Sequence, residues 1–191
     1  MASSVNAVLE DIPDWVKPDI YAKYEGKASG VNYTIIHTIT IISVSSSEII
    51  FKDAYTGFGE QEEYTMSYPK GTMFLTQSQI DSVINSPTTF NFLPSSMMAS
   101  YVKDETITVS SRAFKCVKLK LTYDEGYGDL WVDKISGLII KDIAVHESGA
   151  TISSILLETN VPAPQKEGIP GFPMRSIIIG LLLIVLLLMK K

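Results

Sequence analysis

Few side chains in this sequence could bind a metal, act as a nucleophile or transfer a proton near neutral pH. The chain has two histidines, His37 and His146. His37 falls on the apolar side of an alternating segment. This position indicates a histidine in the core or at its edge, with hydrogen-bond partners for its ring nitrogens. His146 precedes a turn, where we expect it to be exposed. Far apart and without a carboxylate at ligand spacing, they do not form a zinc motif. If the fold placed a carboxylate beside His37, acid–base catalysis would again become a candidate function.

The one cysteine, Cys116, excludes a disulfide within the chain. It alternates with lysines on the polar side of an expected strand, where ammonium groups could lower the pKa of a thiol. No histidine or asparagine motif accompanies it, so we interpret it as a plain half-buried thiol.

Two groups of carboxylates could bind Ca²⁺ weakly, but neither has the spacing of a calcium loop. We interpret both as solvated turns. They comprise Glu60, Glu62 and Glu63 near Asp53, and Asp124, Glu125, Asp129 and Asp133. No glycine-rich phosphate loop, nucleophile elbow or paired-histidine zinc motif is present. We therefore expect a protein that is not an enzyme, with no catalytic residue, no metal and no cofactor.

The charge of the chain is unevenly distributed. The 191 residues carry a net charge of −5, but residues 162–191 carry +3, which leaves −8 on the first 161 residues. Phosphate contacts need clustered lysine and arginine, so the sequence excludes nucleic acid as a partner. Apolar residues make up 46%, enough for a core.

Residues 19–159 read as a mainly β domain. Residues 31–44 alternate between a face with Ile35, His37, Ile39 and Ile41 and a face of threonines and isoleucines. Further strands are expected at 48–55, 60–68, 113–123, 127–133, 138–146 and 151–159. The one expected helix is 77–85, capped by Thr76 or Ser78. These elements predict a curved antiparallel sheet or a partly open barrel with one short helix.

The C-terminal segment has the composition of a membrane anchor. Residues 176–189 carry no charge, and extension back to Phe172 gives eighteen residues, about 27 Å of helix. Arg175 would snorkel to the headgroups at one end. Residues 160–171 form a Pro/Gly linker, and residues 1–18 an N-terminal segment. The anchor is expected to place these residues in or beside the bilayer: Phe172, Arg175, Ile177, Leu181, Leu186, Lys190 and Lys191.

The tail resembles the C-terminal anchors of archaeal surface proteins. Gly168 to Pro173 reads GIPGFP, followed by the hydrophobic stretch and the terminal lysines. This order is similar to tails with a Pro-Gly-Phe motif that archaeosortases process. Pro173 and Arg175 depart from the pattern, so a retained anchor and a processed one both stay open. The resemblance implies a cell-membrane protein with its domain outside and its C-terminus in the cytoplasm.

Two sequence features bear on this orientation. Residues 1–23 contain no apolar region of a signal peptide, so a tail-anchored protein with a cytoplasmic domain is the alternative. Asn32-Tyr33-Thr34 is a glycosylation sequon, which would be used only outside the cell.

A second resemblance concerns residues 113–158. Phe114 to Val117, followed by a strand–turn–strand with Trp131, Asp133-Lys134 and Gly137-Leu138, is similar to bacterial lipoprotein carriers and related half-barrel proteins. It implies a curved sheet around a helix, open on one side. We therefore expect a surface protein with a structural or partner-binding domain, whose partners are the bilayer and envelope proteins or glycans. The alternative is a carrier of an apolar ligand, lined by Ile35, Ile39, Ile41, Phe90, Phe92, Met97 and Met98. The sequence leaves the oligomeric state open.

Overall fold

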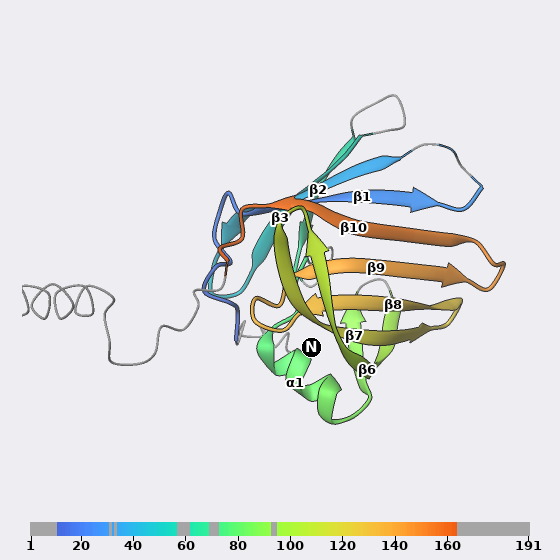
Figure 1. Ribbon diagram of the computed structural model, residues 1–191. Helices are drawn as coiled ribbons and strands as arrows, with labels where there is room; N and C mark the ends of the chain where they lie inside the picture. Colours follow the sequence, from blue (N-terminus) through green and yellow to red (C-terminus); the bar gives the residue numbers. More distant parts are fainter. Residues whose placement is uncertain are drawn as a thin grey trace, which may run out of the picture.

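The structure is a computed structural model that describes residues 11–30, 32, 34–56, 62–68, 73–92 and 95–163. Within these ranges, ten strands and one helix form the domain (Figure 1). They are β1 (Tyr21–Ala28), β2 (Ile35–Val44), β3 (Ile49–Thr56), β4 (Glu62–Ser67), α1 (Gln77–Asn85), β5 (Thr88–Phe92), β6 (Ser95–Val109), β7 (Arg112–Tyr123), β8 (Gly126–Asp133), β9 (Ile139–His146) and β10 (Thr151–Thr159). The expected mainly β fold with one short helix is confirmed.

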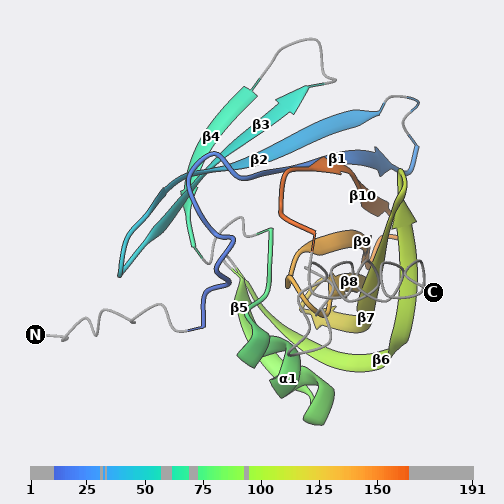
Figure 2. The same ribbon diagram turned by 60° about the vertical axis from the view of Figure 1, so that its left-hand side comes forward.

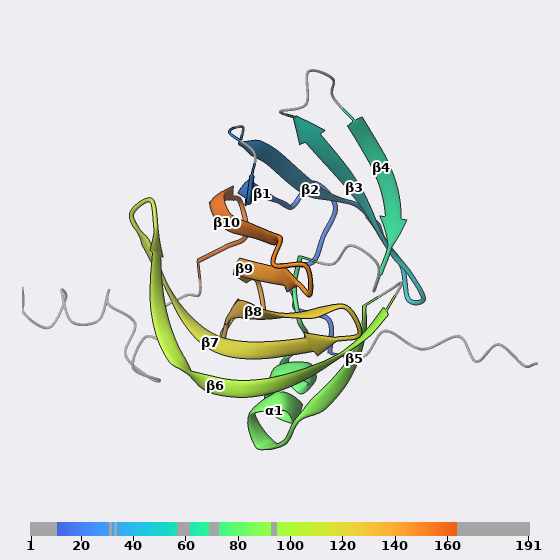
Figure 3. The ribbon, with the colours of Figure 1, turned by 90° about the vertical axis from the view of Figure 1, so that its right-hand side faces the viewer.

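All ten strands belong to one open antiparallel sheet, in the order β4-β3-β2-β1-β10-β9-β8-β7-β6-β5. Most neighbours in the sheet are also neighbours in the chain and are joined by hairpins. The exception is the pair of β1 with β10, which joins the first four strands to the last six. Figure 3 shows the resulting curvature, with β2, β3 and β4 diverging above and the long β6–β7 hairpin arching below.

The chain crosses between the two sheet edges, β4 and β5, through the segment that contains α1. Two backbone hydrogen bonds tie this crossing to the β8–β9 turn, Leu75 N to Gly137 O and Ile139 N to Met73 O. Phe74 and Leu138 form an isolated antiparallel bridge at the same place. Met73, Phe74 and Leu75 are fully buried. The crossing therefore closes part of one sheet face, which we call the helix face.

Helix α1 begins and packs as its sequence predicts. Thr76 and Gln79 form a capping box, in which the Thr76 hydroxyl accepts from Gln79 N and the Gln79 side chain accepts from Thr76 N. Ile80 and Val83 point to the sheet and join a cluster with Phe90, Leu119 and Leu130. Figure 2 shows α1 beside β5 and β6, away from β2 to β4. The helix thus covers only the β5–β8 half of the helix face.

Alternation along the strands places the residues of the other half. In β2, Ile39 and Ile41 are buried while Ile42 on the opposite face is exposed. Both pack in a second cluster with Phe51, Phe74 and Leu156. The expected two faces of residues 31–44 are therefore confirmed in the described part, 34–44.

Three strands were not expected from the sequence: β1, β5 and β6. Segment 86–100, which contains four residues of the expected ligand lining, forms β5 and the start of β6. The prolines of this segment interrupt its strand pattern, and the charged run at 103–105 obscures the rest of β6. Strand β6 forms a hairpin with β7. At the turn of this hairpin, Arg112 donates hydrogen bonds to the carbonyls of Val161 and Pro162.

The burial of Cys116 differs from the half-buried thiol that the sequence predicts. Cys116 and Trp131 lie on the lysine-bearing face, yet both are buried. Trp131 Nε1 donates to Glu105 of β6 at 3.0 Å. The hairpin supplies the cover that the alternation pattern of β7 alone does not show.

Among the described residues, no helix has the length and apolar character needed to cross a bilayer. The segment expected to do so, 172–191, lies outside those residues.

Gly137 and Gly149 offer a matched test of the crossing. Both have φ in the left-handed region, +74° and +84°. An added Cβ at Gly149 meets nothing within 4 Å, whereas at Gly137 it lies 2.1 Å from the carbonyl oxygen of Leu75. We expect Gly149→Ala to lower the free energy of unfolding by about 1 kcal/mol, and Gly137→Ala by about 3 kcal/mol or more. Urea denaturation measures both. Equal losses would contradict the close contact between the crossing and the β8–β9 turn.

Candidate functional site

Five strands bring polar side chains together on the half of the helix face that α1 does not cover. Register pairs Tyr24 of β1 with His37 of β2, and His37 with Tyr55 of β3. Asp53 of β3 pairs with Ile39, which lies two residues after His37 in β2, so Asp53 is on the same face as His37. From the other half of the chain, Asp142 of β9 pairs with Ser154 of β10, which pairs with Gly26 of β1. Because facing residues in antiparallel strands share a face, all these side chains converge.

The first part of the site is an ion-pair contact between His37 and Asp53. His37 Nε2 lies 2.5 Å from Asp53 Oδ1, and Asp53 is almost fully buried while the His37 side chain is 21% exposed. In the described part of the chain, neither of these two atoms has another hydrogen-bond partner. Tyr55 donates to the other carboxylate oxygen at 2.9 Å and stacks on the imidazole with ring centroids 4.5 Å apart. His37 is therefore held in a fixed orientation.

The hydroxyls of the two tyrosines beside His37 are kept protonated. Burial, followed by the charge of Asp53 and the hydrogen bond to it, raises the pKa of Tyr55. Burial, followed by the charge of Asp142, raises the pKa of Tyr24, whose hydroxyl donates to the carbonyl of Ile139 at 3.0 Å. Both tyrosines thus act as neutral donors that fix the walls of the site.

The second part of the site is Asp142. Its Oδ1 accepts a hydrogen bond from Ser154 Oγ. Burial raises the pKa of Asp142, and the Ser154 hydrogen bond and the charge of His37 oppose that rise. Because the hydroxyl of Ser154 donates to Asp142, these residues lack the serine–histidine order of a hydrolase triad.

A cavity of about 140 Å³ joins the two parts. His37, Asp142 and Ser154 supply its polar wall, and Ile39, Met73, Leu130, Ile139 and the Tyr24 ring line the rest. Asp142 lines this cavity, and Asp53, which does not line it, contacts the His37 side chain that does. The two carboxylates together face at most one positive charge, that of His37. The arrangement therefore favours a cation or a proton over an anion.

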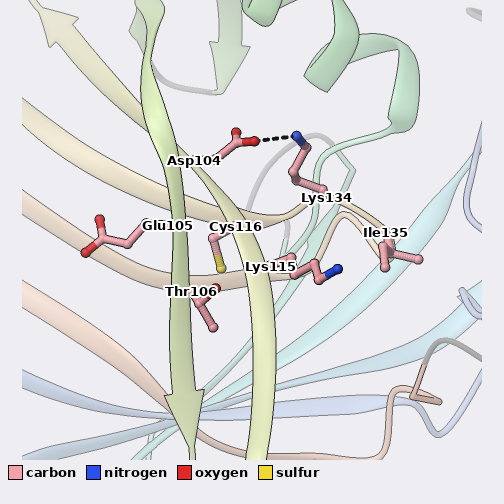
Figure 4. A pocket seen from close by; sticks show the side chains of 7 residues that line it. All are labelled: Asp104, Glu105, Thr106, Lys115, Cys116, Lys134 and Ile135. Carbon is pink, nitrogen blue, oxygen red and sulfur yellow. Dashed lines mark hydrogen bonds and ion pairs between the residues drawn. The ribbon is translucent and has the colours of Figure 1, made fainter. Parts of the chain in front are cut away.

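A second cleft, of about 540 Å³, lies at the β6–β7 hairpin and the β8–β9 turn (Figure 4). Its lining has equal numbers of acidic and basic side chains, and Lys134 Nζ lies 2.8 Å from Asp104 Oδ2. Cys116 points into the base of this cleft. Burial, with smaller contributions from Asp133 and Glu105, raises the pKa of Cys116 to about 12. The possibility that lysines lower the pKa of this thiol is therefore wrong, and the cleft offers no activated nucleophile.

The other residues singled out from the sequence are dispersed. Ile41 and Phe90 are buried in two different clusters, Met97 packs against the second of these, and Met98 is exposed. Ile35 is half-buried, Asn32 is exposed, and the Phe92 side chain lies outside the described residues. So do the anchor positions at 172–191. Of the proposed ligand-lining set, Ile39 reaches the charged cavity.

The described members of the two carboxylate groups expected at turns take different roles, while Glu60 and the side chains of Glu62 and Glu63 lie outside the described residues. Asp53 pairs with His37, Asp133 is buried and accepts from Ser136 N and Oγ, and Asp129 pairs with Lys118 at 3.0 Å. No group of three or more potential metal ligands occurs among the described residues.

The partnership of His37 with Asp53 had a signal in the sequence. Asp53 alternates with Phe51 and Tyr55, so it lies on an apolar face, and the Ser45–Ser47 turn sets its register with β2. No signal in the sequence placed Asp142 in the same site as His37, because this placement requires the pairing of β1 with β10.

No family model and no curated protein matches this sequence. Solved structures that resemble it include Pseudomonas aeruginosa MucB in its complex with MucA (TM-score 0.47, 15% identity, 80% of this chain and 56% of that one). They also include the hypothetical lipoprotein YmcC from Escherichia coli (0.41, 12%, 75% and 88%), and a LolA-superfamily protein from Nitrosomonas europaea (0.23, 10%, 86% and 91%). This chain spans about half the length of MucB. At these identities the similarity concerns the fold alone.

The raised pKa of Asp142 predicts a stability difference that depends on pH. A carboxyl whose pKa is higher in the folded than in the unfolded chain stabilises the fold when protonated, and this stabilisation is lost as the pH rises through the folded pKa. Asp142→Asn cannot ionise. We expect this variant to be more stable than the wild type at pH 7, with the difference fading towards about pH 4, where a free aspartate takes up its proton.

Urea denaturation across this pH range measures the effect. Asp129→Asn is the matched control, because it removes a carboxylate of the opposite face that is paired with Lys118. We expect no gain from it at pH 7. An Asp142→Asn protein less stable than the wild type at pH 7 would contradict the account.

Proposed function

We propose that this protein is a single-pass membrane protein that holds its β domain on the outer face of the cell membrane. In this proposal the domain is not an enzyme and binds a partner through the charged cavity of the helix face. The anchor rests on the sequence of residues 172–191, and the orientation rests on the resemblance of the tail to surface-protein anchors.

The observation that carries partner binding is the site of His37, Asp53 and Asp142. A buried carboxylate pays a desolvation cost that a well-packed apolar residue would not. Here two carboxylates and an imidazole are placed beside a cavity, on the half of the sheet that α1 leaves uncovered. Ionisable groups that burial perturbs in a cleft are typical of functional sites.

The packing of the core favours partner binding over transport of an apolar ligand. Ile41 and Phe90, two of the residues proposed to line a ligand, lie in separate clusters and are fully or almost fully buried. The cavity that is lined by described residues has a polar wall and about 140 Å³ of space. It suits a small polar group better than an acyl chain.

The end of the domain is fixed where the linker leaves it. Val161 is buried, and Arg112 donates to the carbonyls of Val161 and Pro162 at 2.8 and 3.1 Å. The linker from there to residue 171 would reach about 30 Å if extended, at about 3.1 Å per residue. The proposal therefore places the domain close to the membrane surface.

Protease protection on intact cells tests the orientation. We expect external protease to remove the domain, as detected with an antibody to it, while a cytoplasmic marker protein survives. The mass of the surviving fragment then shows whether the segment after Phe172 is retained. A domain that stays protected until the cells are lysed would contradict the proposal and favour a tail-anchored protein that faces the cytoplasm.

A further inference from the structure

We propose that the cavity of the helix face binds a primary alkylammonium group, presented as the side chain of a lysine of the partner. This inference rests on the proposed function, because it names the chemical group that the partner inserts. Four observations support it: the size of the cavity, its apolar walls, its surplus of negative charge and the hydrogen bonding of Asp142.

The cavity has the dimensions of a short alkyl chain. Its volume of about 140 Å³ corresponds to four or five water molecules at about 30 Å³ each, or to roughly five non-hydrogen atoms. Ile39, Met73, Leu130 and Ile139 form the apolar part of the lining. Such walls would pack against the methylene stem of a lysine, which readily lies along apolar surface.

The charge at the polar end suits a cation. Asp142 supplies a carboxylate to the lining, and Asp53 lies outside the lining but contacts His37 at 2.5 Å. His37 contributes at most one positive charge against these two carboxylates. Tyr24 and Tyr55 stay neutral, since burial raises the pKa of each. An anion would meet repulsion from Asp142, and a neutral ligand would leave the carboxylate surplus unmatched.

The hydrogen bonding of Asp142 favours an ammonium over a guanidinium. A guanidinium binds a carboxylate best through two parallel hydrogen bonds, which require both carboxylate oxygens. Oδ1 of Asp142 already accepts from Ser154, and this hydroxyl occupies one of the acceptor positions of Oδ1. A compact ammonium needs only one acceptor position and is less restricted by that hydroxyl.

Titration of the full chain in neutral detergent micelles tests the proposal. The probe is n-butylammonium, followed by methyl NMR of Met73 and Ile39. Butanol and butyrate are neutral and anionic controls of similar shape. We expect saturable shifts with butylammonium in the millimolar range, as for other ligands of this size, and binding at least 10-fold weaker for butanol and butyrate.

Two variants locate the charge. Asp142→Asn removes the carboxylate in the cavity, and we expect it to weaken butylammonium binding 10- to 100-fold, the usual effect of a charge-assisted hydrogen bond. Asp129→Asn removes the same charge from the opposite face of the sheet, and we expect it to leave binding within 2-fold of the wild type. Equal binding to wild type and Asp142→Asn, or equal binding of butanol and butylammonium, would overturn the proposal.

A lysine with both termini blocked as amides separates the two sources of the ammonium group. Binding comparable to that of butylammonium would support a lysine of a polypeptide, while binding of the free amine alone would overturn the assignment to a partner protein. These titrations use the purified chain. A negative result would therefore leave the orientation of the domain in the membrane untouched, since protease protection measures it separately.

Discussion

The pairing of the first strand with the last determines the rest of this structure. β1 and β10 are hydrogen bonded from Ala22–Thr159 to Ala28–Ile152, with a bulge after Lys23. Without this ladder, β1 to β4 and β5 to β10 would be two separate sheets. With it, they form one curved surface whose two edges, β4 and β5, are joined by the crossing that carries α1. The pairing closes a long loop in the sequence, so its contacts form at a high entropic cost.

The candidate site depends on the same pairing. His37, Asp53 and Tyr55 belong to the N-terminal half of the sheet, and Asp142 and Ser154 belong to the C-terminal half. Tyr24 of β1, which lines the cavity, joins the two halves because it pairs with His37 on one side and with Leu156 on the other. Carboxylates there cost stability, and the fold places them where α1 gives no cover. The binding of a cationic group by the open half of the sheet would account for this cost.

The sequence predicted local features well, because they depend on neighbouring residues. The helix at 77–85 and the strand at 151–159 have the bounds expected of them, and the alternation of β2 placed His37 on the correct face. Cys116 was placed on the lysine-bearing face of its strand, where it lies, but its burial depends on the β6–β7 hairpin, whose charged strand β6 has no clear apolar alternation. The sequence could not predict that the strands of His37 and those of Asp142 lie in one sheet, since no local pattern pairs residue 24 with residue 156.

The most direct test of this account is the titration of the Asp142 carboxyl carbon, followed by ¹³C NMR in the wild type and in His37→Gln. The charge of His37 opposes the rise in the pKa of Asp142, so its removal is expected to raise that pKa further. Glu125→Gln, which removes the partner of His146, serves as a control that should leave it unchanged. If the Asp142 titration is the same with and without His37, the two halves of the sheet do not form one charged site, and the account is wrong.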